Sequence, residues 1–363
     1  MVTGGAGFIG SHLVDGLIDG GYRVRALDNL TPPTHNGNLP EWFNKKAEFI
    51  KGDVREKSDW TKALAGVDYV FHLAAYMDYH LDFSTYFDAN TRSTALLYEV
   101  IAEEKLPVQK IILTSSQSVY GEGKYRCPAH GIVYPDPRPV AQLERRQWEM
   151  VCSACGKFLE PLPQKEDDEL KPQIPYGVSK WALEKAGFNL GKLLGIPTVT
   201  ARYSIVHGPR QSFRHFYSGA LRSFAVQALA GQPINIHEDG LQLRDFVNVK
   251  DVTAAHIKLL EDSRADSEAF NIGSGEPTRV VDLAKAVCAA AGAPFQPQTG
   301  EFRVGAPRHS VMDVSKLKEL GWAPKFTIQD NAKEYVGWVK QYPEAKEYLE
   351  ATLADLKNKK IIR

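Results

Sequence analysis

The chain has 363 residues, enough for two structural units with substantial cores, and its apolar share of 43% and charged share of 24% are those of an ordinary globular protein. Lysine plus arginine and aspartate plus glutamate both total 44, so no overall field attracts a nucleic acid or an anionic membrane. No apolar run approaches the roughly 20 residues that span a bilayer, and the first residues lack the sections of a signal peptide. We therefore expect a cytoplasmic protein with no nucleic-acid partner and no membrane partner.

The first residues, VTGGAGFIG, read as a short strand, a glycine-rich turn and the start of an amphipathic helix. Glycine suits such a turn because the turn is tight, the backbone must approach a pyrophosphate closely, and the helix must pack against the strand. The N-terminus of that helix then faces the phosphates. A tight turn needs glycines with or without a ligand, so the pattern alone is weak evidence. The predicted cofactor contacts in this segment are Gly4, Gly7, Phe8, Ile9 and Gly10.

Asp28 strengthens the prediction of a dinucleotide site, because it closes the second predicted strand 18 residues after Gly10. A carboxylate at this position accepts hydrogen bonds from the ribose hydroxyls and repels a 2′-phosphate, which favours NAD over NADP. The alternative is an aspartate that only caps a turn. We expect Asn29 to contact the cofactor as well, and Asp53 and Val54, at the end of the next strand, to border the adenine.

Short β-branched runs alternate with helical stretches over the first two hundred residues; the predicted strands are 22–28, 47–54, 68–75, 110–116 and 197–206. Strands separated by helices imply right-handed crossovers and a parallel sheet that is covered on both faces. The predicted fold is therefore α/β, a doubly wound Rossmann sheet.

The predicted Rossmann domain spans 1–205, and a smaller substrate-binding lobe spans 206–363, with part of 233–270 returning to the Rossmann core. The lobe is predicted because strands and helices alternate less regularly after about residue 205 and glycine and proline residues interrupt the sequence more often. Cys288, in an apolar helical stretch, is expected to be a small buried hydrophobe.

Ser116, Tyr176 and Lys180 are the candidate catalytic residues. Ser116 ends a predicted strand, and open α/β sheets place their ligands at that end of the strands. Tyr176 and Lys180 are four residues apart at a predicted helix start, so their side chains share one face. An unperturbed phenol has a pKa of about 10. A neighbouring ammonium and the positive charge of an oxidised nicotinamide would together favour the phenolate, which could then act as a base at neutral pH.

An interval of little periodicity, 122–172, separates the predicted strand that bears the serine from the helix that bears the tyrosine. It contains a C-x-x-H pair, Cys127 and His130, and a C-x-x-C pair, Cys152 and Cys155, each followed by glycine. Four such ligands make a closed tetrahedral zinc site, so we predict a structural zinc knuckle. A redox C-x-x-C, which would call for a helix N-terminus, and incidental cysteines are the alternatives. The insertion should emerge beside the active-site mouth and could cover or shape the sugar pocket.

Together with HLAA, SSQSVYG, YGVSK, GPRQ, DGLQLRDFVNVKDV, NIGSG and LGW, these motifs resemble the extended short-chain dehydrogenase/reductase superfamily, in its nucleotide-sugar epimerase and dehydratase branch. The resemblance runs from residue 1 to roughly 340, outside the insertion. It implies that Ser116, Tyr176 and Lys180 are the catalytic triad. It assigns cofactor contacts to Leu73, Ala74, Ala75 and Asn90, the last of which precedes the family's dimer helix, and contacts to the diphosphate of a sugar nucleotide to Arg244 and Arg303.

The residues after Ser116 discriminate between the reactions of the branch. The family's 4,6-dehydratases have an acid and a base where this chain has Gln117 and Ser118, neither of which exchanges a proton at neutral pH. The resemblance therefore implies an NAD-dependent 4-epimerase acting on a nucleotide sugar, with Gln117 and Tyr120 as candidate sugar contacts; packing or turn formation is the alternative role for both. Ile205 replaces an asparagine that commonly contacts the substrate, so the nucleotide is not assigned.

Two other activities remain open at this stage: a nucleotide-sugar 4-ketoreductase of the same fold, and a non-catalytic NAD-binding scaffold or sensor. The resemblance also implies a homodimer that pairs the helix after Asn90 with the helix that begins at Tyr176. The insertion itself resembles that of a group of dTDP-L-rhamnose 4-epimerases, which makes a dTDP-6-deoxyhexose or a UDP-sugar the expected substrate.

Overall fold

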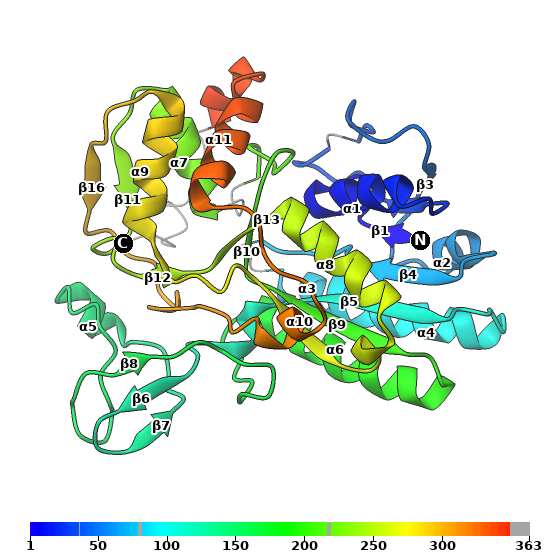
Figure 1. Cartoon of the computed structure of the whole chain (residues 1–363), viewed down its shortest axis with the longest axis horizontal. Coiled ribbons are helices and arrows are strands. Elements are labelled where there is room, and N and C mark those ends of the chain that lie inside the picture. Colours follow the sequence, from blue (N-terminus) through cyan, green and yellow to red (C-terminus); the bar gives the residue numbers. More distant parts are fainter. Residues whose placement is uncertain (36, 79–81, 216–218, 349–363) are drawn as a thin grey trace.

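The computed structural model describes residues 1–35, 37–78, 82–215 and 219–348. A seven-stranded parallel sheet forms the larger part of the molecule, in the order β14-β9-β5-β4-β1-β2-β3 (Figure 1). Its strands are β1 (Val2–Thr3), β2 (Arg25–Asp28), β3 (Glu48–Lys51), β4 (Tyr69–His72), β5 (Lys110–Ser116), β9 (Thr198–Tyr203) and β14 (Ala269–Ile272). The strand order reverses between β1 and β4, which is where doubly wound sheets bind their ligands. The predicted Rossmann sheet is confirmed.

Several strands are shorter than the predicted runs. The run 47–54 contributes only Glu48–Lys51 to the sheet, and the run 68–75 only Tyr69–His72. The residues after each strand, 52–54 and 73–75, follow its carboxyl end and line the cavity described below. The predicted runs therefore extend past β3 and β4 into segments that line the cavity and do not pair in the sheet.

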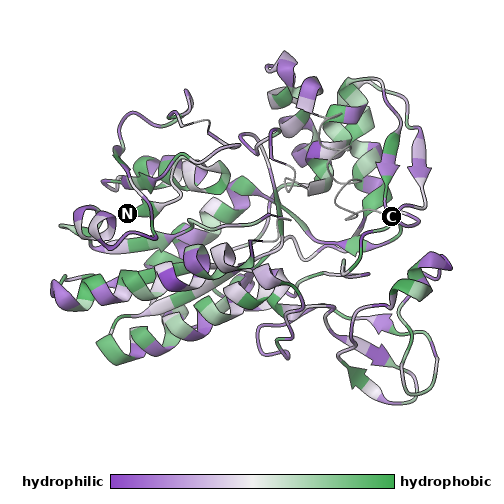
Figure 2. Cartoon of the chain, turned by 180° about the vertical axis from the view of Figure 1, so that it is seen from behind, coloured by the Kyte–Doolittle hydropathy of each residue, from purple (hydrophilic) through white to green (hydrophobic). Residues whose placement is uncertain are grey.

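Helices cover both faces of the sheet (Figure 1). One face packs against α1 (Phe8–Asp19) and α8 (Val249–Glu261), and the other against α2 (Lys57–Leu64), α4 (Ser93–Glu103) and α6 (Pro175–Leu194). The helix ribbons carry both apolar and polar residues, as helices with one buried side do (Figure 2).

The return of the chain to the sheet runs over Val249–Ile272, which holds α8 and β14, whereas β11 (Ile234–Ile236) and β12 (Leu243–Arg244) belong to the second lobe. This return lies in the later part of the predicted range 233–270 and ends two residues beyond it. The core of the second lobe is formed largely by three helices and includes the buried Cys288, as predicted. The helices and remaining paired strands of this part are α7 (Gly219–Leu229), α9 (Val280–Ala291), α11 (Ile328–Val339), β10 (Ile205–His207), β13 (Phe246–Asn248), β15 (Thr278–Arg279) and β16 (Pro297–Thr299).

The insertion forms a small unit of its own beside the second lobe (Figure 1). Its three strands, β6 (Tyr125–Cys127), β7 (Gly131–Val133) and β8 (Glu160–Pro161), pair antiparallel in the order β7-β6-β8, and α5 (Val140–Glu144) follows β7. The other short elements are α3 (Phe83–Tyr86), η1 (Phe87–Arg92), η2 (Gln117–Tyr120), η4 (Ser263–Ala265), α10 (Ser315–Glu319) and η5 (Pro343–Lys346). Over the described residues, the helices are too short or too polar to cross a bilayer.

Candidate active site

A cavity of about 850 Å³ lies at the carboxyl ends of the strands and extends to the second lobe. It is lined by every predicted cofactor, catalytic and substrate residue except Asn90 and Tyr120. The cavity begins at the glycine turn, where Gly4 has a φ of +65° and the first turn of α1 crosses directly over it. A methyl group on Gly10 would lie 2.1 Å from the carbonyl oxygen of Gly4, so only glycine fits this crossing.

Asp28 is held at the edge of this cavity by two backbone amides. The N–H of Ala6 donates to one carboxylate oxygen at 3.1 Å, and the N–H of Leu30 donates to the other at 2.9 Å. Each oxygen keeps a lone pair, and Asp28 lines the cavity. The carboxylate is therefore oriented to accept two further hydrogen bonds from vicinal hydroxyls.

Asp53 also lines the cavity, and Asn29 donates a hydrogen bond to it at 3.1 Å. Burial raises the pKa of Asp53, but hydrogen bonds from Arg55 and Asn29 outweigh this effect and bring the pKa to about 2. The sequence analysis missed Arg55, which lines the cavity as the ion-pair partner of Asp53. The position of Arg55, two residues after Asp53 in the sequence, is the feature that could have predicted this ion pair.

The wall after β4 is fixed from the neighbouring strand, because the Thr3 hydroxyl oxygen accepts the N–H groups of Leu73 and Ala74 at 3.0 Å each. Asn90, a predicted cofactor contact, lies outside the cavity lining. This side chain is fully buried outside the cavity lining, accepts the N–H of Tyr76 at 2.8 Å and donates to the Ser179 hydroxyl at 2.9 Å. Asn90 therefore fixes the wall and α6 and does not itself face the cavity.

Ser116, Tyr176 and Lys180 meet at the cavity, as predicted. Ser116 is the last residue of β5, and Pro175, at the first position of α6, starts the helix that carries the other two. The Lys180 ammonium lies 5.9 Å from the centre of the Tyr176 ring and donates to the carbonyl oxygen of Thr114 at 2.8 Å. All three side chains are buried.

Burial dominates the electrostatics of this group. It raises the pKa of Tyr176 to about 12, although the hydrogen bond with Ser116 acts to lower it. It lowers the pKa of Lys180 to about 7, against the opposing charge of Glu184. Burial thus favours neutral forms of both side chains and weakens the effect of Lys180 on the phenol. The positive charge of a nicotinamide would then contribute more than the lysine to ionising Tyr176 near neutral pH.

On the far side of the cavity, the guanidinium of Arg244 donates to the carbonyl oxygens of Leu243, Pro307 and Arg308 at 2.8, 2.7 and 3.0 Å. Burial lowers its pKa to about 10. Arg303 lines the same part of the cavity. The guanidinium groups of Arg244 and Arg303 suit a ligand with two phosphates.

Gln117 lines the cavity, and its side-chain oxygen accepts the hydroxyl of Ser310 at 3.0 Å. The structure places Tyr120 elsewhere. Tyr120 is 1% exposed, its hydroxyl donates to Asn271 and accepts from Arg202, and the Arg202 guanidinium lies over its ring. This position favours the alternative role of packing for Tyr120, because a buried polar network in the core holds the side chain.

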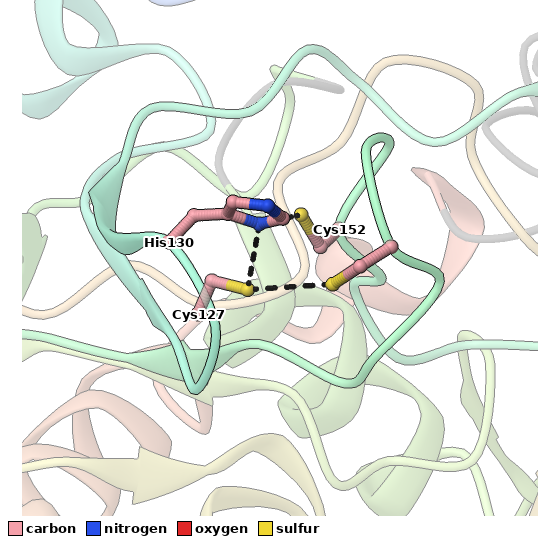
Figure 3. Close-up of side chains that lie close together, drawn as sticks. Cys127, His130 and Cys152 are labelled. Atoms are coloured by element: carbon pink, nitrogen blue, oxygen red, sulfur yellow. Dashed lines mark hydrogen bonds between the residues drawn. The ribbon is translucent and has the colours of Figure 1, made fainter.

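Cys127, His130, Cys152 and Cys155 converge in the insertion, with their ligand atoms all within 4.8 Å of one another. Figure 3 shows the His130 ring between the sulfurs of Cys127 and Cys152, and its Nδ1 lies 3.4 Å from each. The sulfurs of Cys127 and Cys155 are 3.6 Å apart. A tetrahedral zinc with bonds of about 2.3 Å to sulfur and about 2.0 Å to nitrogen would separate such atoms by about 3.5 to 3.8 Å. The three separations of 3.4, 3.4 and 3.6 Å are close to these values, and all four ligand atoms lie within 4.8 Å of one another.

The environment of the sulfurs also suits a metal. Although burial acts to raise it, the pKa of Cys127 falls to about 6 because the N–H groups of Ala129 and His130 and the His130 ring stabilise the thiolate. All four cysteines of the chain are free thiols, and Cys152 and Cys155 lie in a turn and not at a helix N-terminus, which disfavours a redox C-x-x-C.

The insertion flanks the cavity without lining it. Gly121, Gln173 and Ile174 line the cavity at the two ends of the insertion, but within the described residues nothing from 122–172 does. The expected cover over the sugar pocket is therefore not observed. The insertion packs instead on the second lobe, where Arg138 pairs with Glu238 and the ring of Trp148 contacts Phe302.

Comparison with known proteins agrees with this geometry. The model of the NAD dependent epimerase/dehydratase family matches residues 1–139 and 151–273. The chain belongs to this family. Its relatives include a dTDP-L-rhamnose 4-epimerase of Burkholderia thailandensis, 34% identical over 94% of both chains, and a UDP-glucose 4-epimerase of Mycolicibacterium smegmatis, 30% identical over 93% of this chain and 96% of the relative.

Solved structures of other family enzymes superpose on the chain. A UDP-glucose 4-epimerase of Thermotoga maritima, crystallised with UDP-glucose, matches with a TM-score of 0.77 and 30% identity, covering 94% of this chain and 98% of the other. A UDP-glucuronic acid 4-epimerase of Bacillus cereus in complex with NAD matches with a TM-score of 0.74 and 28% identity over the same shares. The family resemblance expected from the motifs is confirmed.

Proposed function

We propose that the protein is an NAD-dependent 4-epimerase of nucleotide sugars, acting on a dTDP-6-deoxyhexose or a UDP-sugar. The observation that carries the proposal is a single cavity with a dinucleotide-type glycine turn at one end, Ser116, Tyr176 and Lys180 in its middle, and Arg244 and Arg303 at the other end. The names of the relatives above support the same activity.

The residues present fit NAD. The glycine turn leaves room for a pyrophosphate against the N-terminus of α1, Asp28 has lone pairs for the ribose hydroxyls, and the carboxylate charges of Asp28 and Asp53 disfavour a 2′-phosphate. When bound, the nicotinamide supplies a hydride acceptor and the positive charge that Tyr176 needs.

The side chains then divide the proton chemistry. The Tyr176 phenolate takes the proton of the sugar's 4-hydroxyl and returns it after the 4-keto sugar has turned over in the cavity. The Ser116 hydroxyl donates to the sugar oxygen as it becomes a carbonyl, which stabilises the developing charge. Gln117 and Ser118 offer no acid or base for the loss of water, so the keto sugar keeps all its substituents.

The four ligands of the insertion hold a structural zinc ion in this proposal. All four coordination positions are filled by the chain, which leaves none for a substrate. The core of the insertion consists of only Tyr125, Cys127, Met150, Cys152 and Leu159, with Val133 packed against it. So small a core needs an additional source of stability. The binding free energy of a structural zinc in zinc-finger peptides is about 10–16 kcal/mol.

We also propose a homodimer in the cytoplasm. The candidate dimer face is formed by α4 and α6, and Trp181, Phe83 and Phe87 expose large apolar surfaces on α6 and the neighbouring segments. A thiolate metal site stays reduced in the cytoplasm.

The test is to incubate purified enzyme with dTDP-, UDP- and GDP-sugars without added reductant and to identify the products by NMR. We expect interconversion of one pair of C4 epimers by an enzyme that carries tightly bound NAD. Turnover only with added NAD(P)H would instead support the 4-ketoreductase. A Tyr176→Phe variant indistinguishable from wild type would support the non-catalytic scaffold.

A further inference from the structure

The insertion meets the second lobe through a cluster of five charged side chains, which we call the interface charge cluster. Arg138, Glu238 and Arg308 are buried, whereas the side chains of Glu149 and Asp239 are 44% and 30% exposed. Arg138 and Glu149 come from the insertion, Glu238 and Asp239 from the loop after β11, and Arg308 from the loop before α10. Arg308 is 0% exposed, and its guanidinium donates hydrogen bonds to all three carboxylates of the cluster. It is one of the points at which the insertion and the lobe are joined.

Such a cluster is stable only with good geometry, since buried charges lose their hydration. Here the geometry is close to complete. Arg138 binds Glu238 through two hydrogen bonds at 3.0 and 2.9 Å and also donates to the carbonyl oxygens of Trp148 and Ala306. The cluster therefore holds the main chain of the loop at Ala306 as well as the side chain of Arg308.

The same loop positions the phosphate-side arginine of the cavity. The carbonyl oxygens of Pro307 and Arg308 accept two of the three hydrogen bonds that orient the Arg244 guanidinium. On its other side, the N–H of Arg308 donates to the buried carboxyl group of Glu122 at 2.6 Å, and Glu122 is the first residue of the insertion. The main chain at 307–308 is thus held between the insertion and Arg244.

We infer that Arg308 is a positioning residue that makes the affinity for the substrate's diphosphate depend on the metal-bearing insertion. Glu149 lies three residues before Cys152, so ordering of the metal site fixes Glu149. One oxygen of Glu149 accepts from Arg308 and the other pairs with His309, so Glu149 helps to hold the segment whose carbonyl groups orient Arg244. The inference rests on the proposed function, in which Arg244 binds that diphosphate. It explains how an insertion that lines none of the cavity can influence substrate recognition.

Glu149→Ala tests the inference, because Arg308 keeps Glu238 and Asp239 as partners and the fold is retained. Glu160→Ala is the matched control, since Glu160 lies in the same insertion and pairs only loosely with exposed Arg126 at 3.6 Å. Binding of dTDP, UDP, thymidine and uridine to the NAD-loaded, zinc-loaded enzymes is measured by calorimetry. For Glu149→Ala we expect about tenfold weaker binding of the nucleoside diphosphate that wild type prefers, unchanged binding of its nucleoside, and a KM raised by the same factor with kcat within about twofold. For Glu160→Ala we expect wild-type values.

The outcomes separate the two proposals. If wild type binds neither dTDP nor UDP, the proposed function fails. If wild type binds one of them and Glu149→Ala binds it equally well, the inference alone is overturned. A nucleoside affinity that falls by the same factor as the diphosphate affinity also overturns it, since Arg244 would then not be the group affected. If Glu149→Ala loses its zinc, Glu149→Gln, which keeps the shape of the side chain, is judged by the same criteria.

Discussion

The crossing of α1 over the glycine turn leaves no space for a side chain at Gly10. A methyl group there would lie 2.1 Å from the carbonyl oxygen and 2.8 Å from the carbonyl carbon of Gly4, where contacts under 3.0 Å are essentially never seen. The obstacle is backbone, so in Gly10→Ala the helix and the turn must separate by about 1 Å, at a cost of about 1–3 kcal/mol. A displacement of that size at a preorganised site costs on the order of 100-fold in function. We therefore expect Gly10→Ala to bind NAD about 100-fold more weakly.

The assay is the NAD content of the purified protein, released by denaturation and measured by chromatography, together with thermal denaturation. Gly337→Ala is the control, since Gly337 lies within α11 and a methyl group there meets nothing within 4 Å. The control should keep its NAD and gain up to about 1 kcal/mol in stability from helix propensity. Gly10→Ala protein with the wild-type NAD content and melting temperature would refute the assignment of this turn as the pyrophosphate site.

Three further predictions concern chemistry, metal and pH. Tyr176→Phe should lower kcat by about 10²- to 10⁴-fold while the NAD content stays unchanged, and a kcat within about twofold of wild type would contradict its role as the base. Cys155→Ser should lower the zinc content well below about one per chain in metal analysis, whereas Cys288→Ser, which changes a buried cysteine outside the cluster, should not; equal zinc in both would exclude the tetrahedral site. Burial raises the pKa of Glu122 from 4.5 to about 7, against the Arg308 backbone hydrogen bond and nearby arginines, so the folded protein holds this proton more tightly than the unfolded chain does. Stability should therefore fall as the pH rises through the window between these two values, and Glu122→Gln should flatten that fall in thermal denaturation measured from about pH 5 to about pH 8; an unchanged slope would contradict the assignment.

The sequence predicted those parts of the site that short spacings and strand ends determine. The glycine turn, Asp28 and Ser116 stand at the ends of strands, where the topology of a parallel sheet alone brings them to one edge. Tyr176 and Lys180 share a helix face. The convergence of Cys127, His130, Cys152 and Cys155 was predictable because two close pairs, each followed by glycine, are typical of zinc knuckles.

The sequence did not predict which way individual side chains turn in the tertiary structure. Tyr120 follows the strand of Ser116, yet its side chain turns into the core. Arg202 and Asn271, on strands that are distant in the sequence, offer it buried hydrogen-bond partners. Asn90 likewise serves the backbone of Tyr76. Neither choice has a local signal, since the partners are brought together only by the fold.

The docking of the insertion was unpredictable for the same reason. The charges at 138, 149, 238, 239 and 308 are far apart in the sequence, and each alone reads as an ordinary surface charge. The matched family model skips residues 140–150, which include Glu149, and ends before Arg308.

The measurement that tests the proposed epimerisation most directly follows the hydrogen on C4. A nucleotide sugar deuterated at C4 is incubated with the enzyme and its own bound NAD, and the products are analysed by NMR and mass spectrometry. If the hydride leaves C4 and returns to the same carbon of the same molecule, the C4 epimer keeps all its deuterium without added reductant. Loss of the deuterium, or turnover that requires external NAD(P)H, would contradict the account.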